Sequence, residues 1–142
     1  MMEKEFIEYQ KILERTGDLE SKKNDHCKII DSFYAESIIQ IENSEKPIVR
    51  KDILKTLEIK NLNGVISVNT KIKEVKINKS KGIIWGKMVI NFETSSSKKS
   101  RLKEVFIQKW KEGKIIYQRF LYGDSDKLIE EKLNLTLQGF EE

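Results

Sequence analysis

The spacing of the apolar residues changes at Gly64, and this change constrains the fold more than any other feature of the sequence. Before Gly64 the apolar residues recur every three or four positions, which is typical of helices with one buried face. From Ile66 to Tyr122 they alternate with polar residues, which is typical of strands with one buried face. A chain with helices first and consecutive strands afterwards is expected to form an α+β domain with an antiparallel sheet.

The part before Gly64 contains signals for three helices and one short strand. Thr16-Gly17-Asp18 interrupts the first amphipathic stripe, because glycine readily adopts the left-handed conformation that ends a helix. Pro47 interrupts the short strand, since proline cannot donate a hydrogen bond to a sheet. The expected elements are a helix over Glu3–Arg15, a helix from an Asn24 or Asp25 cap through Tyr34, a strand over Ser37–Glu42 and a helix over Asp52–Leu57.

The part after Gly64 contains signals for four long strands. In the first strand the apolar phase slips by one residue at Lys73-Glu74, which predicts a β-bulge and a sharp bend of the sheet. Glu112-Gly113 predicts a tight hairpin between the last two strands. The expected strands cover 66–77, 83–92, 102–110 and 115–122, and a final helix capped by Asp124 or Ser125 is expected over Leu128, Ile129 and Leu133.

Composition indicates one ordinary globular domain over residues 1–142. The chain is 38% apolar and 35% charged, and its 27 basic and 23 acidic residues are mixed along the sequence, so no nucleic-acid partner is expected. One cysteine, Cys27, and one histidine, His26, predict neither a disulfide nor a metal site, and no cofactor motif is present. No apolar stretch is long enough to cross a membrane and the first nine residues do not resemble a signal peptide, so a cytoplasmic protein without a membrane partner is expected.

Several short motifs occur in a characteristic order. Phe33-Tyr34-Ala35-Glu36-Ser37 lies between the second helix and the first strand, Lys51-Asp52-Ile53 opens the third helix, and Trp110 precedes the turn Glu112-Gly113-Lys114-Ile115. With the closing strand Arg119–Asp124, this order resembles the nuclear-transport-factor-2-like superfamily, and within it the SnoaL-like polyketide cyclases and ketosteroid isomerases. The resemblance spans about Glu5 to Asp124, with an apparent insertion near Ser21–His26.

This resemblance implies a cone-shaped, strongly bent antiparallel sheet wrapped around three N-terminal helices, with an apolar pocket inside. Alternation in the last two strands indicates which side chains point inward. The residues expected to contact a ligand are Tyr9, Tyr34, Glu104, Phe106, Trp110, Gln118, Phe120 and Tyr122.

The resemblance also implies three catalytic candidates. Glu42 matches the general base of ketosteroid isomerases, and Gln108 stands where those enzymes have a protonated aspartic acid, so steroid isomerisation itself is not expected. Asp124 lies near an acidic residue of SnoaL-like cyclases. The alternatives are structural: Glu42 opens a solvated loop, Gln108 is a core amide, and Asp124 caps the final helix.

Two functions therefore stay open. The first is a domain that binds a hydrophobic small molecule and transfers a proton on a ketone or enol, as an isomerase or cyclase does. The second is a non-catalytic association domain. In either case a homodimer is expected through the outer sheet face, which would offer Trp85, Val89, Val105 and Ile107. The basic stretches Lys71–Lys81 and Lys98–Lys103 are interpreted as lysines that keep hairpin edges soluble, and Trp85 and Trp110 as core or interface residues.

Overall fold

The computed structural model describes residues 2–96 and 98–140. Its helices are α1 (Met2–Leu13), α2 (Leu19–Phe33), α3 (Lys51–Asn61) and α4 (Asp126–Gly139). Its strands are β1 (Tyr34–Glu42), β2 (Ile48–Val49), β3 (Val65–Asn78), β4 (Ile83–Thr94), β5 (Lys99–Lys111) and β6 (Lys114–Leu121). They form one six-stranded sheet in the order β2-β1-β6-β5-β4-β3, so the α+β class is confirmed.

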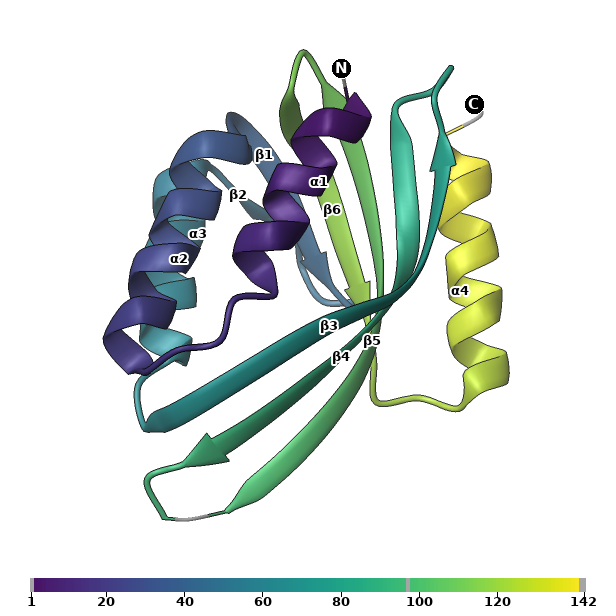
Figure 1. Cartoon of the computed structure of the whole chain (residues 1–142). Coiled ribbons are helices and arrows are strands. Elements are labelled where there is room, and N and C mark those ends of the chain that lie inside the picture. Colours follow the sequence, from purple (N-terminus) through teal and green to yellow (C-terminus); the bar gives the residue numbers. More distant parts are fainter. Residues whose placement is uncertain (1, 97, 141–142) are drawn as a thin grey trace.

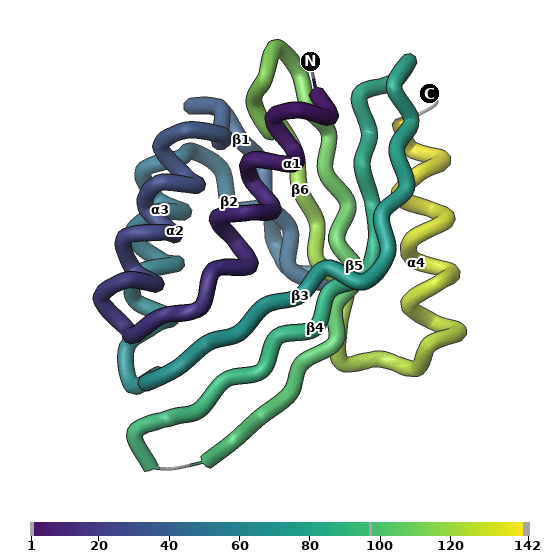
Figure 2. The backbone as a smooth tube through the Cα atoms, viewed as in Figure 1, coloured from purple at the N-terminus to yellow at the C-terminus, as the bar shows by residue number. Residues whose placement is uncertain are grey.

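The sheet is strongly bent and carries helices on both faces. Helices α1, α2 and α3 lie on the concave side, whereas α4 returns along the convex side of β5 and β6 (Figure 1). The backbone trace shows the far ends of β3, β4 and β5 extending past the helices as a three-stranded arm (Figure 2). This is the cone expected from the sequence, with one helix more on its outside.

One strand pair departs from the antiparallel expectation. β3 to β6 pair antiparallel as predicted, but β1 lies parallel to β6, with Ile39 opposite Tyr117 and Glu42 opposite Phe120. The sheet is therefore mixed. Parallel neighbours need a long crossover connection, and the chain from α3 through β5 provides it.

The predicted bulge is confirmed. The pairing register of β3 and β4 shifts between Ile72 and Glu74, so Lys73 is the extra residue. Just past the bulge, opposite Val75, the sheet requires a glycine: a Cβ on Gly86 would lie 1.8 Å from the backbone oxygen of Glu74. The bulge and the glycine together allow the two backbones to approach closely where the sheet bends.

The expected start of the second helix was wrong. Helix α2 begins at Leu19, because the Asp18 side chain accepts a hydrogen bond from the Ser21 backbone over 2.8 Å and caps it. Ser21–His26 therefore lies within the first half of α2. Its residue Lys22 is buried and donates to the carbonyl of Arg15 over 2.7 Å, which satisfies a group near the end of α1.

Aromatic rings fill the space between α1, α2 and the sheet. Phe6 stacks on Phe106 at 6.1 Å between ring centroids, and Tyr9 and Phe33 meet Trp110 edge-on at 6.2 and 6.0 Å. Phe106 and Trp110 point into this core as the alternation predicted. The deep part of the cone is therefore a packed core.

Helix α4 forms a second core with the convex face. Its residues Ile129, Leu133, Leu137 and Phe140 pack on Val105, Ile107 and Leu121, with Trp85 at the edge. The predicted cap is confirmed, since Ser125 accepts a hydrogen bond from the Leu128 backbone. The helix covers part of the face that was expected to form a dimer. Homodimerisation itself stays a prediction.

Candidate functional site

Three polar side chains gather at the open end of the cone. Glu42 is the last residue of β1 and lies opposite Phe120 of β6, whose other neighbour is Phe106. Tyr122 follows β6 directly, and its hydroxyl lies close enough to the Glu42 carboxylate for each group to shift the pKa of the other. Glu104 of β5 lies on the same face of the sheet as the buried Met88. It is close enough to Glu42 for the negative charge of Glu42 to raise its pKa.

The residue after Glu42 holds this end of β1 in place. Asn43 has a left-handed backbone, with φ of 54°, a conformation that asparagine tolerates better than most residues. Its backbone N–H donates to the Phe120 carbonyl over 2.7 Å, and its side-chain oxygen accepts from the Tyr122 N–H over 2.9 Å. Glu42 is thus fixed to the strand end that carries its partner Tyr122.

Burial controls the protonation of this group. It raises the pKa of Glu104 to about 7, with a further contribution from the negative charge of Glu42. Burial also raises the pKa of Glu42, against the nearby Tyr122 hydroxyl and the hydrogen bond from Gln40, which favour its charged form. The pKa of the Tyr122 hydroxyl rises to about 12 for the same reasons, burial first and Glu42 second. At neutral pH Glu104 can therefore hold a proton.

Apolar side chains adjoin the two carboxylates. Ile72 and Met88 share a cross-strand row with Glu104, and Met88 is buried. Ile90 and Phe120 are half-buried and pack against the main core. A ligand at this end would meet apolar surface on one side and carboxyl groups on the other.

A chain of buried amides runs behind the site. Trp110 Nε1 donates to Gln108 over 3.1 Å, Gln108 donates to Gln118 over 3.3 Å, and Gln118 donates to Gln40 over 2.6 Å. Gln40 then donates to the Glu42 carboxylate over 3.2 Å. The chain connects the closed end of the cone to Glu42 and leaves each amide oxygen with a donor.

A branch of this chain reaches the surface. Gln118 also donates to the Tyr34 hydroxyl over 2.7 Å, and that hydroxyl donates to Glu58 over 3.0 Å. The other oxygen of Glu58 lies 3.5 Å from Nδ1 of His26. Sequence reasoning missed Gln40, Asn43 and Glu58. Alternation could have identified Gln40, because it shares a strand face with Glu42.

The predicted site residues fall into two groups. Glu42, Glu104, Phe120 and Tyr122 lie together at the open end, all partly accessible. The others are core residues: Tyr9, Tyr34, Phe106, Gln108, Trp110 and Gln118 are each at most 4% exposed. Gln108 is joined to Glu42 only through Gln118 and Gln40, and Asp124 is separate, since its carboxylate pairs with Lys132 over 2.8 Å.

The surface of the described residues has two hollows. One, of about 350 Å³, is on the arm and shares no residue with this site. The other, of about 440 Å³, is between the sheet and the start of α4, and Met88 and Glu104 belong to its lining. Within residues 2–96 and 98–140, no group of three or more His, Cys, Asp or Glu side chains is arranged to hold a metal ion. In the same residues no helix has the length and apolar character to span a membrane.

Comparison with known proteins identifies structural relatives only. No protein-family model matches the sequence, and no curated protein matches it. Among solved structures, a nuclear-transport-factor-2-like protein of unknown function from an Exiguobacterium species superposes with a TM-score of 0.68 at 10% identity, covering 85% of this chain and 99% of that one. A provisionally assigned SnoaL-like polyketide cyclase from Shewanella putrefaciens gives a TM-score of 0.66 at 11% identity, covering 92% and 93%.

An LEH-like epoxide hydrolase from M. tuberculosis has the same architecture. It superposes with a TM-score of 0.61 at 12% identity, covering 85% of this chain and 90% of that one. At such identities the agreement concerns the backbone and leaves the chemistry open. The bent sheet, the three helices inside it and these superpositions together establish that the chain has the nuclear-transport-factor-2-like fold of the SnoaL-like proteins.

Proposed function

We propose that the chain binds a hydrophobic small molecule at the open end of the cone and transfers a proton on it. The observation that carries this proposal is the convergence of Glu42, Glu104 and Tyr122 beside an apolar surface. Two carboxyl groups in different protonation states are what a general base and a general acid require.

The reaction proposed is keto–enol isomerisation of an apolar ketone. The charged carboxylate of Glu42 removes a proton from the carbon next to the carbonyl; the electron pair of that C–H bond forms the C=C bond, and the π pair of the C=O bond moves to the oxygen. The protonated Glu104 stabilises the developing oxyanion and supplies its proton. In the reverse direction Glu42 returns its proton to carbon and the enol O–H returns its proton to Glu104, so both carboxyl groups are regenerated and the reaction needs no cofactor and no redox partner.

Some of the structural neighbours have the names of enzymes. They include provisionally assigned SnoaL-like polyketide cyclases and an LEH-like epoxide hydrolase. The fold is shared, and the residues of the site have to carry the argument for this chain.

A ketone with an acidic C–H bond tests the proposal. We would follow exchange of the hydrogens of 2-tetralone with D2O by NMR, with the chain at catalytic concentration. Glu42→Gln keeps the shape of the side chain and removes the base, so the exchange rate should fall by about 10²–10⁴-fold while tetralone affinity stays within threefold. Glu45→Gln, an exposed glutamate three residues away, is the matched control and should keep the full rate. An equal rate for wild type and Glu42→Gln would refute the assignment of the base.

The second candidate is a non-catalytic association domain. The observation that favours it is the filled cone, since Phe6, Tyr9 and Trp110 occupy the deep interior. This candidate predicts a dimer in light scattering and no chemical-shift change at Glu104, Phe120 or Tyr122 when tetralone is added.

A further inference from the structure

Two basic stretches that are far apart in the sequence lie side by side in the folded chain. β3 and β5 flank β4, so Lys71, Val89 and Lys103 form one cross-strand row. Asn69, Asn91 and Arg101 form the next row. Residues directly opposite each other project to the same face of a sheet. The charges of both stretches therefore accumulate on the convex side of the arm.

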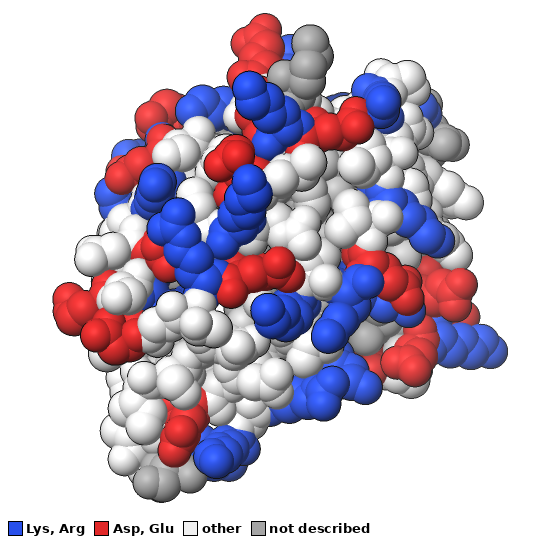
Figure 3. All heavy atoms as spheres, viewed as in Figure 1, with Lys and Arg blue, Asp and Glu red and all other residues white. Residues whose placement is uncertain are grey.

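This surface is here called the basic face. It consists of Lys71, Lys73 and Lys76 of β3, Lys87 of β4, and Lys99, Arg101 and Lys103 of β5, all of them exposed. Only Glu74 and Glu93 bring negative charge to the same strands on this side, and Glu74 lies 3.9 Å from Lys87. Figure 3 shows blue side chains gathered along the lower edge of the long strands, while both signs mix over the N-terminal helices.

The basic face accounts for the charge of the whole chain. The net charge is only +4, yet the strands contribute seven cations and two carboxylates to this surface. Among the described residues, the ammonium groups of Lys71, Lys73, Lys76 and Lys103 have no carboxylate within ion-pair distance. Lysines that served only to keep a sheet edge soluble would be needed on the outermost strand, but Lys87 lies on β4 and Lys103 on β5, inside the sheet.

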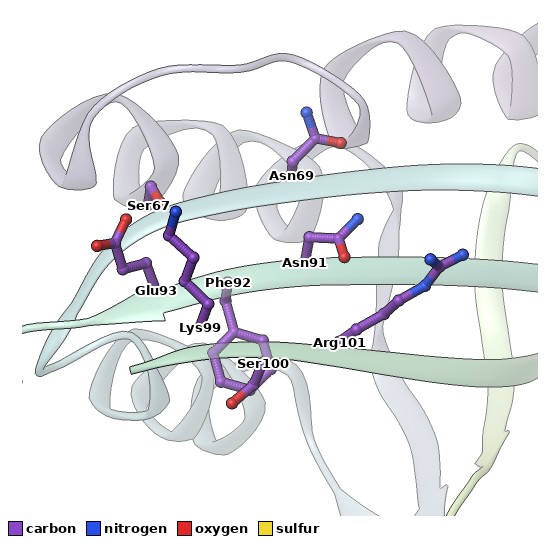
Figure 4. A pocket seen from close by; sticks show the side chains of 8 residues that line it. All are labelled: Ser67, Asn69, Asn91, Phe92, Glu93, Lys99, Ser100 and Arg101. Atoms are coloured by element: carbon purple, nitrogen blue, oxygen red, sulfur yellow. The ribbon is translucent and has the colours of Figure 1, made fainter. Parts of the chain in front are cut away.

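The surface is also hollowed. The hollow of about 350 Å³ lies over Ser67, Asn69 and Asn91, between Lys99 and Arg101. Figure 4 shows these polar side chains on one side of the three strands. The hollow of about 440 Å³ continues along the same face, with the half-buried Trp85 in its lining.

We propose that the basic face binds single-stranded nucleic acid. The cations would follow the phosphate chain, and Arg101 and Trp85 offer planar groups on which bases can stack. The amides of Asn69 and Asn91 supply donors and acceptors together, which base edges and sugar hydroxyls can use. The paired donors and acceptors of these amides match the edges of unpaired bases, so the proposal commits to a nucleic acid and not to an acidic peptide or a lipid surface.

The acidic residues of α4 limit the path that a bound nucleic acid can take over the basic face. Asp126 and Glu130 form the opposite wall of the second hollow, across from Lys73 and Lys103. These carboxylates would repel phosphates. The nucleic-acid backbone is therefore expected to run along Lys73 and Lys103, between the arm and the bend of the sheet.

Fluorescence anisotropy of the intact chain tests this proposal. The probes are fluorescein-labelled 15-nucleotide oligo(U) RNA, oligo(dT) DNA and a duplex of equal length, compared with a decaglutamate peptide and phosphatidylserine vesicles. We expect micromolar binding of the single strands. With about four phosphates contacted, the slope of log K against log salt should be about −3. Tighter binding to the peptide or the vesicles than to the single strands would overturn the proposal.

Two double variants with the same change in net charge distinguish a local binding site on the basic face from nonspecific electrostatic attraction. Arg101→Glu with Lys103→Glu should weaken oligonucleotide binding at least tenfold. Lys28→Glu with Lys60→Glu reverses two exposed lysines on α2 and α3 and should change binding less than threefold. Equal losses in both variants would show that net charge alone is responsible. Thermal unfolding confirms that each variant is folded.

A third variant addresses the amides. Asn69→Ala with Asn91→Ala should weaken binding severalfold without changing the salt slope, because no charge is removed. An unchanged affinity would leave only charge attraction and contradict a nucleic-acid site. The basic face and Glu42 lie on opposite sides of the sheet, so Glu42→Gln should bind oligonucleotide as tightly as the wild type. This result does not depend on whether the chain acts on a ketone.

Discussion

The side-chain amide of Gln118 donates to the Tyr34 hydroxyl over 2.7 Å, and this bond joins the middle of β6 to the first residue of β1. Both residues are at most 4% exposed. The Tyr34 hydroxyl passes the interaction on to Glu58 of α3, so one buried hydroxyl holds two strands and a helix in position. Buried polar groups of this kind stabilise only when every partner is present.

Replacement of Tyr34 by Phe should therefore be costly. It leaves one Gln118 N–H without its acceptor in a buried site and removes the donor to Glu58. We expect a loss of about 1–3 kcal/mol in the free energy of unfolding, measured with urea. Tyr117→Phe is the control, because Tyr117 is only half-buried and water can replace its hydroxyl. Similar losses in the two variants would contradict a special role for the buried bond.

The protonation of Glu104 predicts a pH-dependent stability. Its pKa is about 7 in the folded chain and 4.5 in the reference state, so the folded state holds this proton more tightly. Stability is then unaffected by this group below about pH 4.5, falls as the pH rises toward 7, and stays lower above that. Glu104→Gln removes the penalty, which is on the order of 1–3 kcal/mol at pH 8.

Thermal unfolding at two pH values checks this. Glu104→Gln should unfold at a higher temperature than the wild type at pH 8 and at about the same temperature at pH 4. The control is Glu93→Gln on β4, which lies on the other side of the sheet and should behave alike at both pH values. A wild-type advantage at pH 8 would mean that Glu104 is charged and well solvated.

The bend of the sheet depends on Gly86. A Cβ there would lie 1.8 Å from the Glu74 carbonyl oxygen, and neither backbone can move without breaking the pairing of β3 and β4. Gly86→Ala should cost more than about 3 kcal/mol in urea unfolding. Gly139→Ala, where a Cβ would have no neighbour within 4 Å, should change stability by less than about 1 kcal/mol.

Helix α4 protects the convex core from association. Leu133 packs on the sheet, whereas Leu135 is 67% exposed. Leu133→Asp should detach the helix, expose Val105 and Ile107, and raise the mass measured by light scattering above that of the wild type at the same concentration. Leu135→Asp adds the same charge on the outer side of α4 and should keep the wild-type mass. No difference between the two variants would show that α4 is not needed to cover the sheet.

Much of the fold could be predicted because local patterns carry it. The alternation in β5 correctly placed Phe106 and Trp110 on one face of the sheet and Val105 and Ile107 on the other. The phase slip in β3 correctly located the bulge. The start of α2 was wrong because the polar stretch that begins it looks like a loop. Only in the folded chain does Lys22 bury its side chain against the end of α1.

The candidate site could be predicted less well. Glu42 and Tyr122 were identified and do lie together, but six of the other residues expected to bind or react are in a closed core. Alternation indicates that a side chain points inward and says nothing about how much space is left there. The aromatic rings of α1 and α2 occupy that space.

Local spacing in the sequence was enough to predict most helices and strands and the face of the sheet on which their residues lie, because these follow from periods of three to four and of two residues. The tertiary structure alone decided which distant charges meet. Glu104 lies beside Glu42 only because β1 pairs in parallel with β6, and Lys103 lies in one row with Lys71 only because β4 runs between β3 and β5 in one register. Such pairings depend on long-range register, which local spacing does not contain.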